Sequence, residues 1–342
     1  MRLSMSIGHG GGFDRSVDRI EELERAGLDM AWVGEAYGFD APTQLGYLAA
    51  RTTRIELGAG ILNLYSRPPT LIAQTAAGLD YVSDGRAILG IGTSGAQVIE
   101  GFYGVPFDRP LQRTREVIDI CHQVWDREPV VHDGAYQIPL PAGRGTGLGK
   151  PIKLAAHPSR PRIPIYVAAL GPRNVALTAE RGDGWLTTLY IPELAKTVWG
   201  DAIEEGSGRR PKELGPLEVL AGGAVAIGED VTGLREQARP TAARYIGGMG
   251  ARGHNYYNDL VCRYGFESEA RHIQDLYLDG HRADAEAAVP DDFLEKTSLI
   301  GSPGYIKERL AAYEEAGVTV LSVTPIGGDP VAVVTQLREW VA

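Results

Sequence analysis

One pattern repeats along this chain and limits what it can fold into: an amphipathic helix, a tight turn and a short apolar strand. Residues 20–35 (IEELERAGLDMAWVGE) and 307–325 (KERLAAYEEAGVTVLSVTP) are near copies of it from opposite ends of the sequence. Further copies occupy residues 49–63, 78–92 and 176–188. Apolar residues recur at helical spacing before each turn and form a continuous run after it, which is typical of βα units with buried parallel strands.

The apolar runs predict eight strands. Eight strands alternating with helices in 342 residues indicate a TIM (β/α)8 barrel of the α/β class, formed as a single domain over residues 1–342. Strand order is not visible in a sequence, so a doubly wound sheet is the alternative. The predicted strands are Leu3–Ile7, Met30–Glu35, Ile55–Ile61, Ala87–Gly92, Ile163–Ala168, Gly184–Thr187, Leu217–Ile227 and Val318–Val323.

Two longer segments interrupt the repeat. Residues 129–162 are rich in Pro and Gly and contain VVHDGAYQIPLPAG, which predicts a small hairpin followed by a loop. Residues 230–296 read as helices joined by loops. Both segments follow strands in the count. We therefore expect both insertions at the C-terminal face of the barrel, where the loops of such barrels form substrate sites.

Gly90, Gly92 and Gly95 match the dinucleotide fingerprint G-x-G-x-x-G, directly after an apolar run. A Rossmann fingerprint belongs on the first strand of its fold and opens a long helix. Here three βα units come first, and glycines and prolines interrupt the segment that follows. The context therefore predicts a glycine turn at the end of a barrel strand, where bare backbone can approach a flat ring or a phosphate.

Charge and composition exclude several classes of partner. The net charge of −10 argues against nucleic acid and anionic membranes. Cys121 and Cys262 have no His or Cys at metal spacing, so we expect reduced thiols and no metal site, in a cytoplasmic protein. The N-terminus lacks an export signal, and no apolar stretch is long enough to span a membrane.

Residues 56–118 and 163–186 resemble the core of the luciferase-like flavin and deazaflavin superfamily. Within it, the chain is most similar to the branch that uses the deazaflavin coenzyme F420, including proteins like methylenetetrahydromethanopterin reductase. The similarity extends over essentially the whole chain, including GGMGARGHNYYNDL at 247–260. The resemblance implies a TIM barrel with the coenzyme ring across its C-terminal mouth.

The resemblance further implies that a bulge in the third strand supports the ring. This bulge maps to GAGILN, and the non-prolyl cis peptide common in the family would join Gly60 to Ile61. Asn63 and Ser66, just beyond the third predicted strand, are further candidate partners of the coenzyme. The alternative is an ordinary strand end.

The same resemblance makes the turn after the fourth strand a border of the ring and its ribityl chain. Its candidate cofactor-binding residues are Gly92, Thr93, Ser94 and Gly95. The alternative is a glycine turn with no ligand.

After the fifth strand, Gly171 and Pro172 open a helix, and free N–H groups at a helix start bind anions. The resemblance makes this the site of the tail phosphate, with Arg173 and Asn174 beside it. Simple helix capping is the alternative.

Charge gives independent support for a tail site. Residues 134–179 contain no Asp or Glu, so they form a basic stretch in an acidic protein. This stretch would attract the phosphodiester and polyglutamate tail of F420, whereas FMN carries one terminal phosphate and needs less positive charge to bind. The alternative is a solvated basic loop. The basic residues are Arg144, Lys150, Lys153, Arg160, Arg162 and Arg173.

Glu35 and His9 are the candidate catalytic residues, because Glu35 ends the second predicted strand and His9 follows the first. Relatives often carry a His or Asp near the ring at the position of Glu35, and a half-buried carboxylate there could act as acid or base. The alternative for Glu35 is a carboxylate hydrogen-bonded to backbone or to a coenzyme hydroxyl. Some relatives place a catalytic Glu near the position of His9, which is either a substitute proton carrier or a pocket wall.

The chain departs from the family after the fourth strand. Ala96 stands where relatives can carry an acid, followed by Gln97, so the proton-transfer scheme of the sugar-phosphate dehydrogenases in this family does not carry over. Glu100 is the nearest remaining acid. Weaker candidates in the insertions are His157, His254 and Tyr256.

Together these features predict an F420-dependent oxidoreductase that exchanges a hydride with a small organic substrate. The resemblance implies a homo-oligomer, dimeric or larger. The first alternative is an FMN-dependent luciferase-like monooxygenase. The second alternative is a barrel that binds the coenzyme without catalysis. Ala96 is compatible with it, because relatives can carry an acid at that position.

Overall fold

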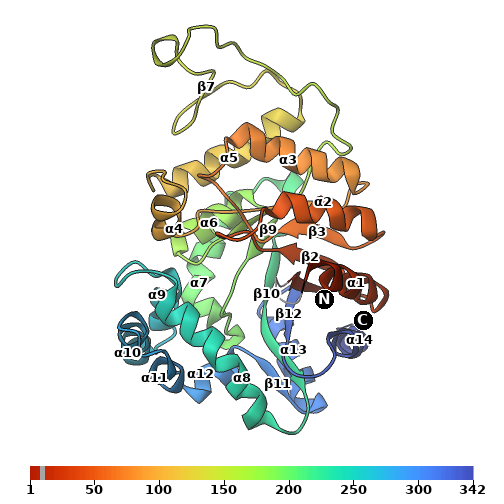
Figure 1. Cartoon of the computed structure of the whole chain (residues 1–342), viewed down its shortest axis with the longest axis vertical. Helices are drawn as coiled ribbons and strands as arrows, with labels where there is room; N and C mark the ends of the chain where they lie inside the picture. Colours follow the sequence, from red (N-terminus) through yellow and green to blue (C-terminus); the bar gives the residue numbers. More distant parts are fainter. Residues whose placement is uncertain (8–11, 342) are drawn as a thin grey trace.

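Eight parallel strands close into a barrel (Figure 1). The computed structural model describes residues 1–7 and 12–341. Around the ring the order is β1, β2, β3, β5, β8, β9, β10 and β12, and β12 pairs with β1 to close it. The predicted α/β TIM barrel is confirmed, and the doubly wound alternative is wrong because the sheet is closed.

The strands are β1 (Arg2–Ile7), β2 (Met30–Val33), β3 (Glu56–Ala59), β4 (Leu62–Asn63), β5 (Ala87–Gly92), β6 (His132–Asp133), β7 (Gln137–Ile138), β8 (Ile165–Ala168), β9 (Gly184–Leu186), β10 (Glu218–Ile227), β11 (Leu299–Gly301) and β12 (Val320–Pro325). The helices are α1 (Phe13–Arg25), α2 (Ala41–Arg51), α3 (Pro69–Val82), α4 (Ala96–Gly101), α5 (Pro110–Trp125), α6 (Pro172–Arg181), α7 (Pro192–Ser207), α8 (Val231–Ala243), α9 (Tyr256–Arg263), α10 (Glu267–Leu278), α11 (Arg282–Ala287), α12 (Asp291–Lys296), α13 (Pro303–Glu315) and α14 (Pro330–Val341). Short helical turns are η1 (Ala142–Arg144), η2 (Lys212–Leu214) and η3 (Arg244–Gly248).

The third barrel strand is broken into β3 and β4 by a bulge. From Leu57 to Leu62 the chain advances five residues, while the partners on β5, Ala87 and Ile91, advance four. One extra residue on this strand is the mark of a β-bulge. The bulge that the family resemblance implied at GAGILN is therefore confirmed.

Strand β11 was not predicted from the sequence. It pairs with the last three residues of β10, beyond the region where β10 pairs with β9. The ten residues of β10 are enough for its first half to pair within the barrel and its last three residues to pair with β11.

Two large rings fill the inside of the barrel. Trp32 on β2 and Tyr166 on β8 are buried, with ring centroids 5.5 Å apart. Each ring lies against a glycine: a Cβ on Gly58 would stand 2.3 Å from Trp32, and one on Gly184 would stand 2.4 Å from Tyr166. The interior is thus a packed core, and Trp32 lies below the C-terminal mouth.

An ion cluster covers the amino-terminal end of the barrel. Arg2 Nη1 donates to Glu56 at 2.7 Å, and Arg2 Nη2 pairs with Glu218 and contacts the Tyr166 hydroxyl at 3.3 Å. Burial raises the pKa of Glu56 despite its pairing with Arg2.

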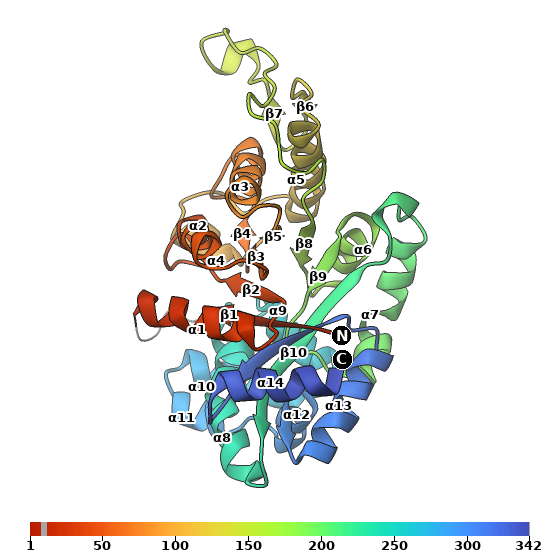
Figure 2. The same cartoon turned by 90° about the vertical axis from the view of Figure 1, so that its right-hand side faces the viewer.

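Segment 129–162 does not start at the C-terminal face, which corrects the expectation. It follows helix α5, which runs antiparallel to the strands, so it leaves the barrel at the amino-terminal end. On its return, Arg160 donates to the carbonyl of Ala87, the first residue of β5, at 2.8 Å. The predicted hairpin is confirmed as β6–β7, and the remaining segment extends outward beyond α3 and α5 (Figure 2).

Segment 230–296 follows strand β10, as expected, and contains helices α8 to α12. These helices gather at one end of the molecule (Figure 1). α9 reaches the mouth, because Arg263 Nη2 donates to the carbonyl of Leu170, just beyond β8, at 2.8 Å. In the described part of the chain, none of the helices is both long enough and apolar enough to cross a membrane.

Candidate active site

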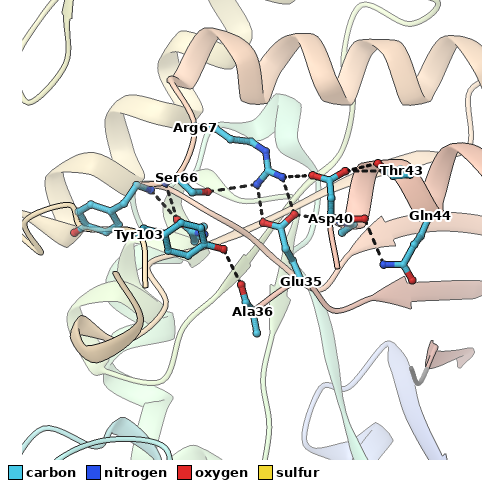
Figure 3. Close-up of polar contacts among 11 residues, drawn as sticks. Glu35, Ala36, Asp40, Thr43, Gln44, Ser66, Arg67 and Tyr103 are labelled. Atoms are coloured by element: carbon cyan, nitrogen blue, oxygen red, sulfur yellow. Dashed lines mark hydrogen bonds and ion pairs between the residues drawn. The ribbon is translucent and has the colours of Figure 1, made fainter. Parts of the chain in front are cut away.

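A buried ion pair joins the carboxyl ends of the second and third barrel strands. Glu35 follows β2 and Arg67 follows β4, and their side chains are 5% and 15% exposed. Arg67 Nη1 and Nη2 donate to the two carboxylate oxygens of Glu35 at 2.6 and 2.7 Å, and Nη2 also donates to Asp40 at 2.7 Å (Figure 3). Glu35 Oε2 also accepts the Ala41 N–H at 3.1 Å. Both oxygens of Glu35 thus have partners within the protein.

These contacts favour one of the two roles considered for Glu35, that of a carboxylate hydrogen-bonded at the top of the barrel. The hydrogen bond to Glu35 raises the pKa of Arg67, so the guanidinium stays charged. Arg67 was not among the predicted site residues. In the sequence Arg67 is simply the residue after Ser66. No local pattern indicates that its side chain pairs with Glu35, which is 32 residues away.

The bulge faces the mouth. The peptide bond between Gly60 and Ile61 is cis, as the family resemblance implied. Gly60 is exposed and Ile61 is half-buried. Asn63 is buried, and its Oδ1 accepts the N–H groups of Tyr65 at 3.1 Å and Ser66 at 2.8 Å. Asn63 therefore fixes the turn that leads from the bulge to Arg67.

The first two glycines of the fingerprint are required by close packing with the bulged strand. A Cβ on Gly90 would stand 1.8 Å from the carbonyl oxygen of Ala59, and one on Gly92 would stand 2.6 Å from Cδ1 of Ile61. These glycines let β5 approach the bulge. They are strand residues of a barrel, as the failed Rossmann context indicated.

The turn after β5 opens toward solvent. Thr93, Ser94 and Gly95 are half-buried, and Ser94 adopts a left-handed conformation with φ of 58°. The Thr93 hydroxyl donates to the Ser94 carbonyl at 3.2 Å. A Cβ on Gly95 would meet nothing within 4 Å. The turn therefore offers hydroxyls and backbone beside free space.

The start of α6 lies at the next strand of the ring. Gly171 precedes the helix and Pro172 is its first residue, and a Cβ on Gly171 would meet nothing within 4 Å. Arg173 is exposed. Asn174 Oδ1 is buried, and it lacks a hydrogen-bond partner among residues 1–7 and 12–341. An acceptor held in this way is available for a donor from a ligand or from water.

Two further polar atoms near these strand ends share this property and were missed by the sequence reasoning. Thr187 Oγ1 follows β9, and Arg263 Nη1 comes from α9; both are buried without a partner in the described parts of the chain. Burial lowers the pKa of Arg263. Thr187 is the last residue of a predicted strand, and this position could have identified it as a site candidate. Arg263 lies in segment 230–296, and no sequence pattern indicates that α9 carries it to the mouth.

The basic stretch does not form one patch, which corrects the charge argument. Arg160 pairs with Asp80, and Arg162 pairs with Asp183 at 2.9 Å, which precedes β9 at the amino-terminal end. Arg144, Lys150 and Lys153 lie in the outward extension. Only Arg173 of the six stands at the carboxyl end of the barrel strands, at the start of α6.

The remaining candidates are dispersed. His9 lies outside the described residues. His157 contacts Arg127 at 3.2 Å in segment 129–162, and His254 is exposed in the loop before α9. Glu100 is exposed and accepts the Phe107 N–H at 3.1 Å. Tyr256 is 46% exposed at the start of α9.

Three neighbouring strands of the ring thus end in complementary features. The broken strand β3–β4 ends in the bulge. Strand β5 ends in the turn of residues 93–95, which we call the hydroxyl turn. Strand β8 leads to the start of α6, where Asn174 Oδ1 is buried without a partner in the described residues. Bare backbone suits a flat ring, hydroxyls suit a polyol, and free N–H groups suit a phosphate. The residues present therefore fit a planar coenzyme with an anionic tail.

Comparison with known proteins agrees with this geometry. The family model described as luciferase-like monooxygenase matches residues 1–320. The chain belongs to the luciferase-like monooxygenase family. A Mycobacterium tuberculosis protein, whose name places it among coenzyme F420-dependent oxidoreductases, is 38% identical over 332 residues, covering 95% of both chains.

Two archaeal proteins extend the comparison. The 5,10-methylenetetrahydromethanopterin reductase of Archaeoglobus fulgidus is 29% identical over 321 residues, covering 91% of this chain and 89% of the relative. The structure of the coenzyme F420-dependent tetrahydromethanopterin reductase from Methanopyrus kandleri shares the fold, with a TM-score of 0.81 and 24% identity over 98% and 96% of the two chains. The predicted family and its F420-dependent branch are confirmed.

Proposed function

We propose that this luciferase-like protein binds coenzyme F420 at the carboxyl mouth of its barrel and exchanges a hydride with a small organic substrate. The observation that carries this proposal is the adjacency of the bulge, the hydroxyl turn and the α6 start on three consecutive strands. The names of its relatives favour F420 over FMN.

Each part of the mouth has a separate task in this proposal. The backbone at Gly60 and Ile61 supports the ring, Thr93 and Ser94 hydrogen-bond the polyol, and Arg173 holds the phosphate at the start of α6. Asn174 Oδ1 accepts a hydrogen bond from a donor group of the coenzyme or from water. The coenzyme, when bound, supplies the hydride chemistry. The protein's contribution is to hold the two reacting carbons in contact, roughly 3–3.5 Å apart, and to exclude water.

Glu35 supports the reaction by positioning in this proposal. It holds Arg67, which in turn fixes the loop beside the ring. We expect Glu35→Gln to lower turnover more than coenzyme affinity, and equal losses would reassign Glu35 to coenzyme binding. The proton-carrying role of His9 stays a prediction, and His9→Ala with a pH profile of turnover tests it.

The deciding experiment is titration of the purified protein with F420 and with FMN, followed by absorbance. We expect saturable binding of F420, weaker binding of FMN, and substrate-dependent change of F420 absorbance in a screen of enones, imines and alcohols. Formation of an oxygenated product from a substrate, reduced FMN and oxygen would instead support the monooxygenase alternative. F420 binding without turnover with any redox partner would support the non-catalytic barrel.

A further inference from the structure

Two loops meet on one side of the mouth and present aromatic rings to solvent. One loop, residues 36–40, follows β2; the other carries Phe102 and Tyr103 after α4. Tyr103 Oη donates to the Ala36 carbonyl at 2.7 Å, which ties the loops together (Figure 3). The ring centroids of Tyr37 and Phe102 lie 6.3 Å apart, and each side chain is 62% exposed. We call these two rings the aromatic wall.

The backbone below the wall is held before any ligand arrives. Arg67 bridges Glu35 and Asp40, which stand at the two ends of the loop that carries Tyr37. The Gly38 N–H donates to the Glu35 carbonyl at 2.8 Å. A preformed surface spares a ligand the entropic cost of ordering it.

The charged groups near the wall are mainly carboxylates, and they outnumber the cation that pairs with them. The carboxylates of Glu35 and Asp40 both pair with Arg67, and Glu100 accepts a backbone N–H. On the opposite side, at β8 and α9, Asn174 and Arg263 each keep a buried polar atom without a partner in the described residues. One side of the mouth therefore combines exposed aromatic rings with an excess of carboxylates, which disfavours an anionic substrate, and the other side is polar.

The exposed area of the wall fits a small molecule better than a second protein chain. Together with Phe39, which is 72% exposed and lies in the same loop as Tyr37, the two side chains of the wall offer on the order of 400 Å². A stable protein interface needs about 800 Å² on each partner. The wall is also continuous with the strand ends that carry Glu35 and the hydroxyl turn.

We propose that Tyr37 and Phe102 bind the apolar, uncharged part of the substrate, so that this enzyme acts on neutral cyclic or aromatic carbonyl compounds or alcohols rather than on phosphorylated or carboxylated ones. This inference rests on the proposed function. A flat substrate packs against the exposed rings while the coenzyme tail occupies the polar side. An anionic group at the wall would lose hydration without gaining a partner.

Acetophenone and 4-acetylbenzoate test this choice, because they share a planar ketone and differ by one carboxylate. Their affinities are measured by saturation-transfer NMR on protein loaded with F420. We expect acetophenone to bind about tenfold more tightly than 4-acetylbenzoate. Tyr37→Ala and Phe102→Ala should each weaken acetophenone binding about fivefold.

Tyr81→Ala is the matched control, because Tyr81 on α3 is 73% exposed and lies outside the mouth. It should leave acetophenone affinity unchanged, and all three variants should keep F420 affinity and melting temperature. Equal affinity for the two probes, no binding of either, or unchanged acetophenone affinity in both wall variants would overturn the inference. A lower oligomer mass for Phe102→Ala in light scattering would overturn it in favour of a subunit contact. Failure of the wild type to bind F420 is read separately and refutes the proposed function.

Discussion

The guanidinium of Arg67 donates two hydrogen bonds, of 2.6 and 2.7 Å, to the carboxylate of Glu35 at the mouth of the barrel. The two residues come from the ends of adjacent barrel strands. A bidentate pair of this kind fixes both orientation and distance. The pair therefore sets the shape of the loops that border the mouth.

Arg67→Met should destabilise the protein more than Glu35→Gln does. Loss of Arg67 leaves a buried carboxylate without its cation, which costs about 3–5 kcal/mol. Glu35→Gln leaves Arg67 paired with Asp40, so we expect about 1–3 kcal/mol. Urea unfolding of both single variants and the double variant measures this. Strict additivity in the double variant would contradict the coupling.

Arg173→Glu should weaken F420 binding, and more strongly at low than at high salt, because an exposed charge is screened by ions. Lys212→Glu makes the same charge change in η2, between α7 and β10, and serves as control. Fluorescence titration at two salt concentrations measures both. Equal losses in the two variants would assign the effect to net charge alone.

Glu24 should make stability fall in acid. Its carboxylate is buried and accepts backbone N–H groups from Thr53, Arg54 and Ile55 at 3.0, 2.6 and 2.8 Å. Burial acts to raise its pKa, but these hydrogen bonds bring the pKa below its usual value of 4.5. A lowered pKa stabilises the fold above the unfolded-state value, and this stabilisation is lost as pH falls through the folded-state value.

Glu24→Gln should therefore cost about 1.5–3 kcal/mol at pH 7. The gap between the variant and the wild type should shrink as the pH is lowered below 4.5. Denaturant unfolding across this pH range measures it. Glu22→Gln on the exposed face of α1 is the control, with an expected change within about 0.5 kcal/mol. A gap that is constant with pH would refute the assignment.

Gly90→Ala and Gly95→Ala should have opposite outcomes despite their shared motif. The added Cβ at position 90 would stand 1.8 Å from the Ala59 carbonyl oxygen, so the strands would have to separate. At position 95 it would meet nothing within 4 Å. We expect loss of soluble folded protein for the first variant and an unchanged melting temperature for the second. Similar stabilities would show that the bulge adapts.

Sequence periodicity predicted most of the barrel because parallel strands buried on both faces leave a local apolar signal. It missed β11, a three-residue strand that exists only because β10 extends past the barrel. It also expected segment 129–162 to project from the carboxyl face, but the segment starts at the amino-terminal end and its hairpin packs back along α5, where Tyr136 Oη donates to the Leu64 carbonyl at 2.7 Å. The strand count placed this segment directly after the fourth strand, whereas helix α5 lies between the two and returns the chain to the amino-terminal end.

The sequence by itself determined the barrel, the glycine turn after the fourth strand and the family, because these depend on patterns within a few dozen residues. The tertiary structure alone decided the partners of each charge. It paired Glu35 with Arg67, paired Arg160 and Arg162 with distant acids, and brought Arg263 from an insertion to the mouth. Ion pairs form between side chains that the fold brings close together, and the separation of two residues along the sequence does not indicate their distance in space.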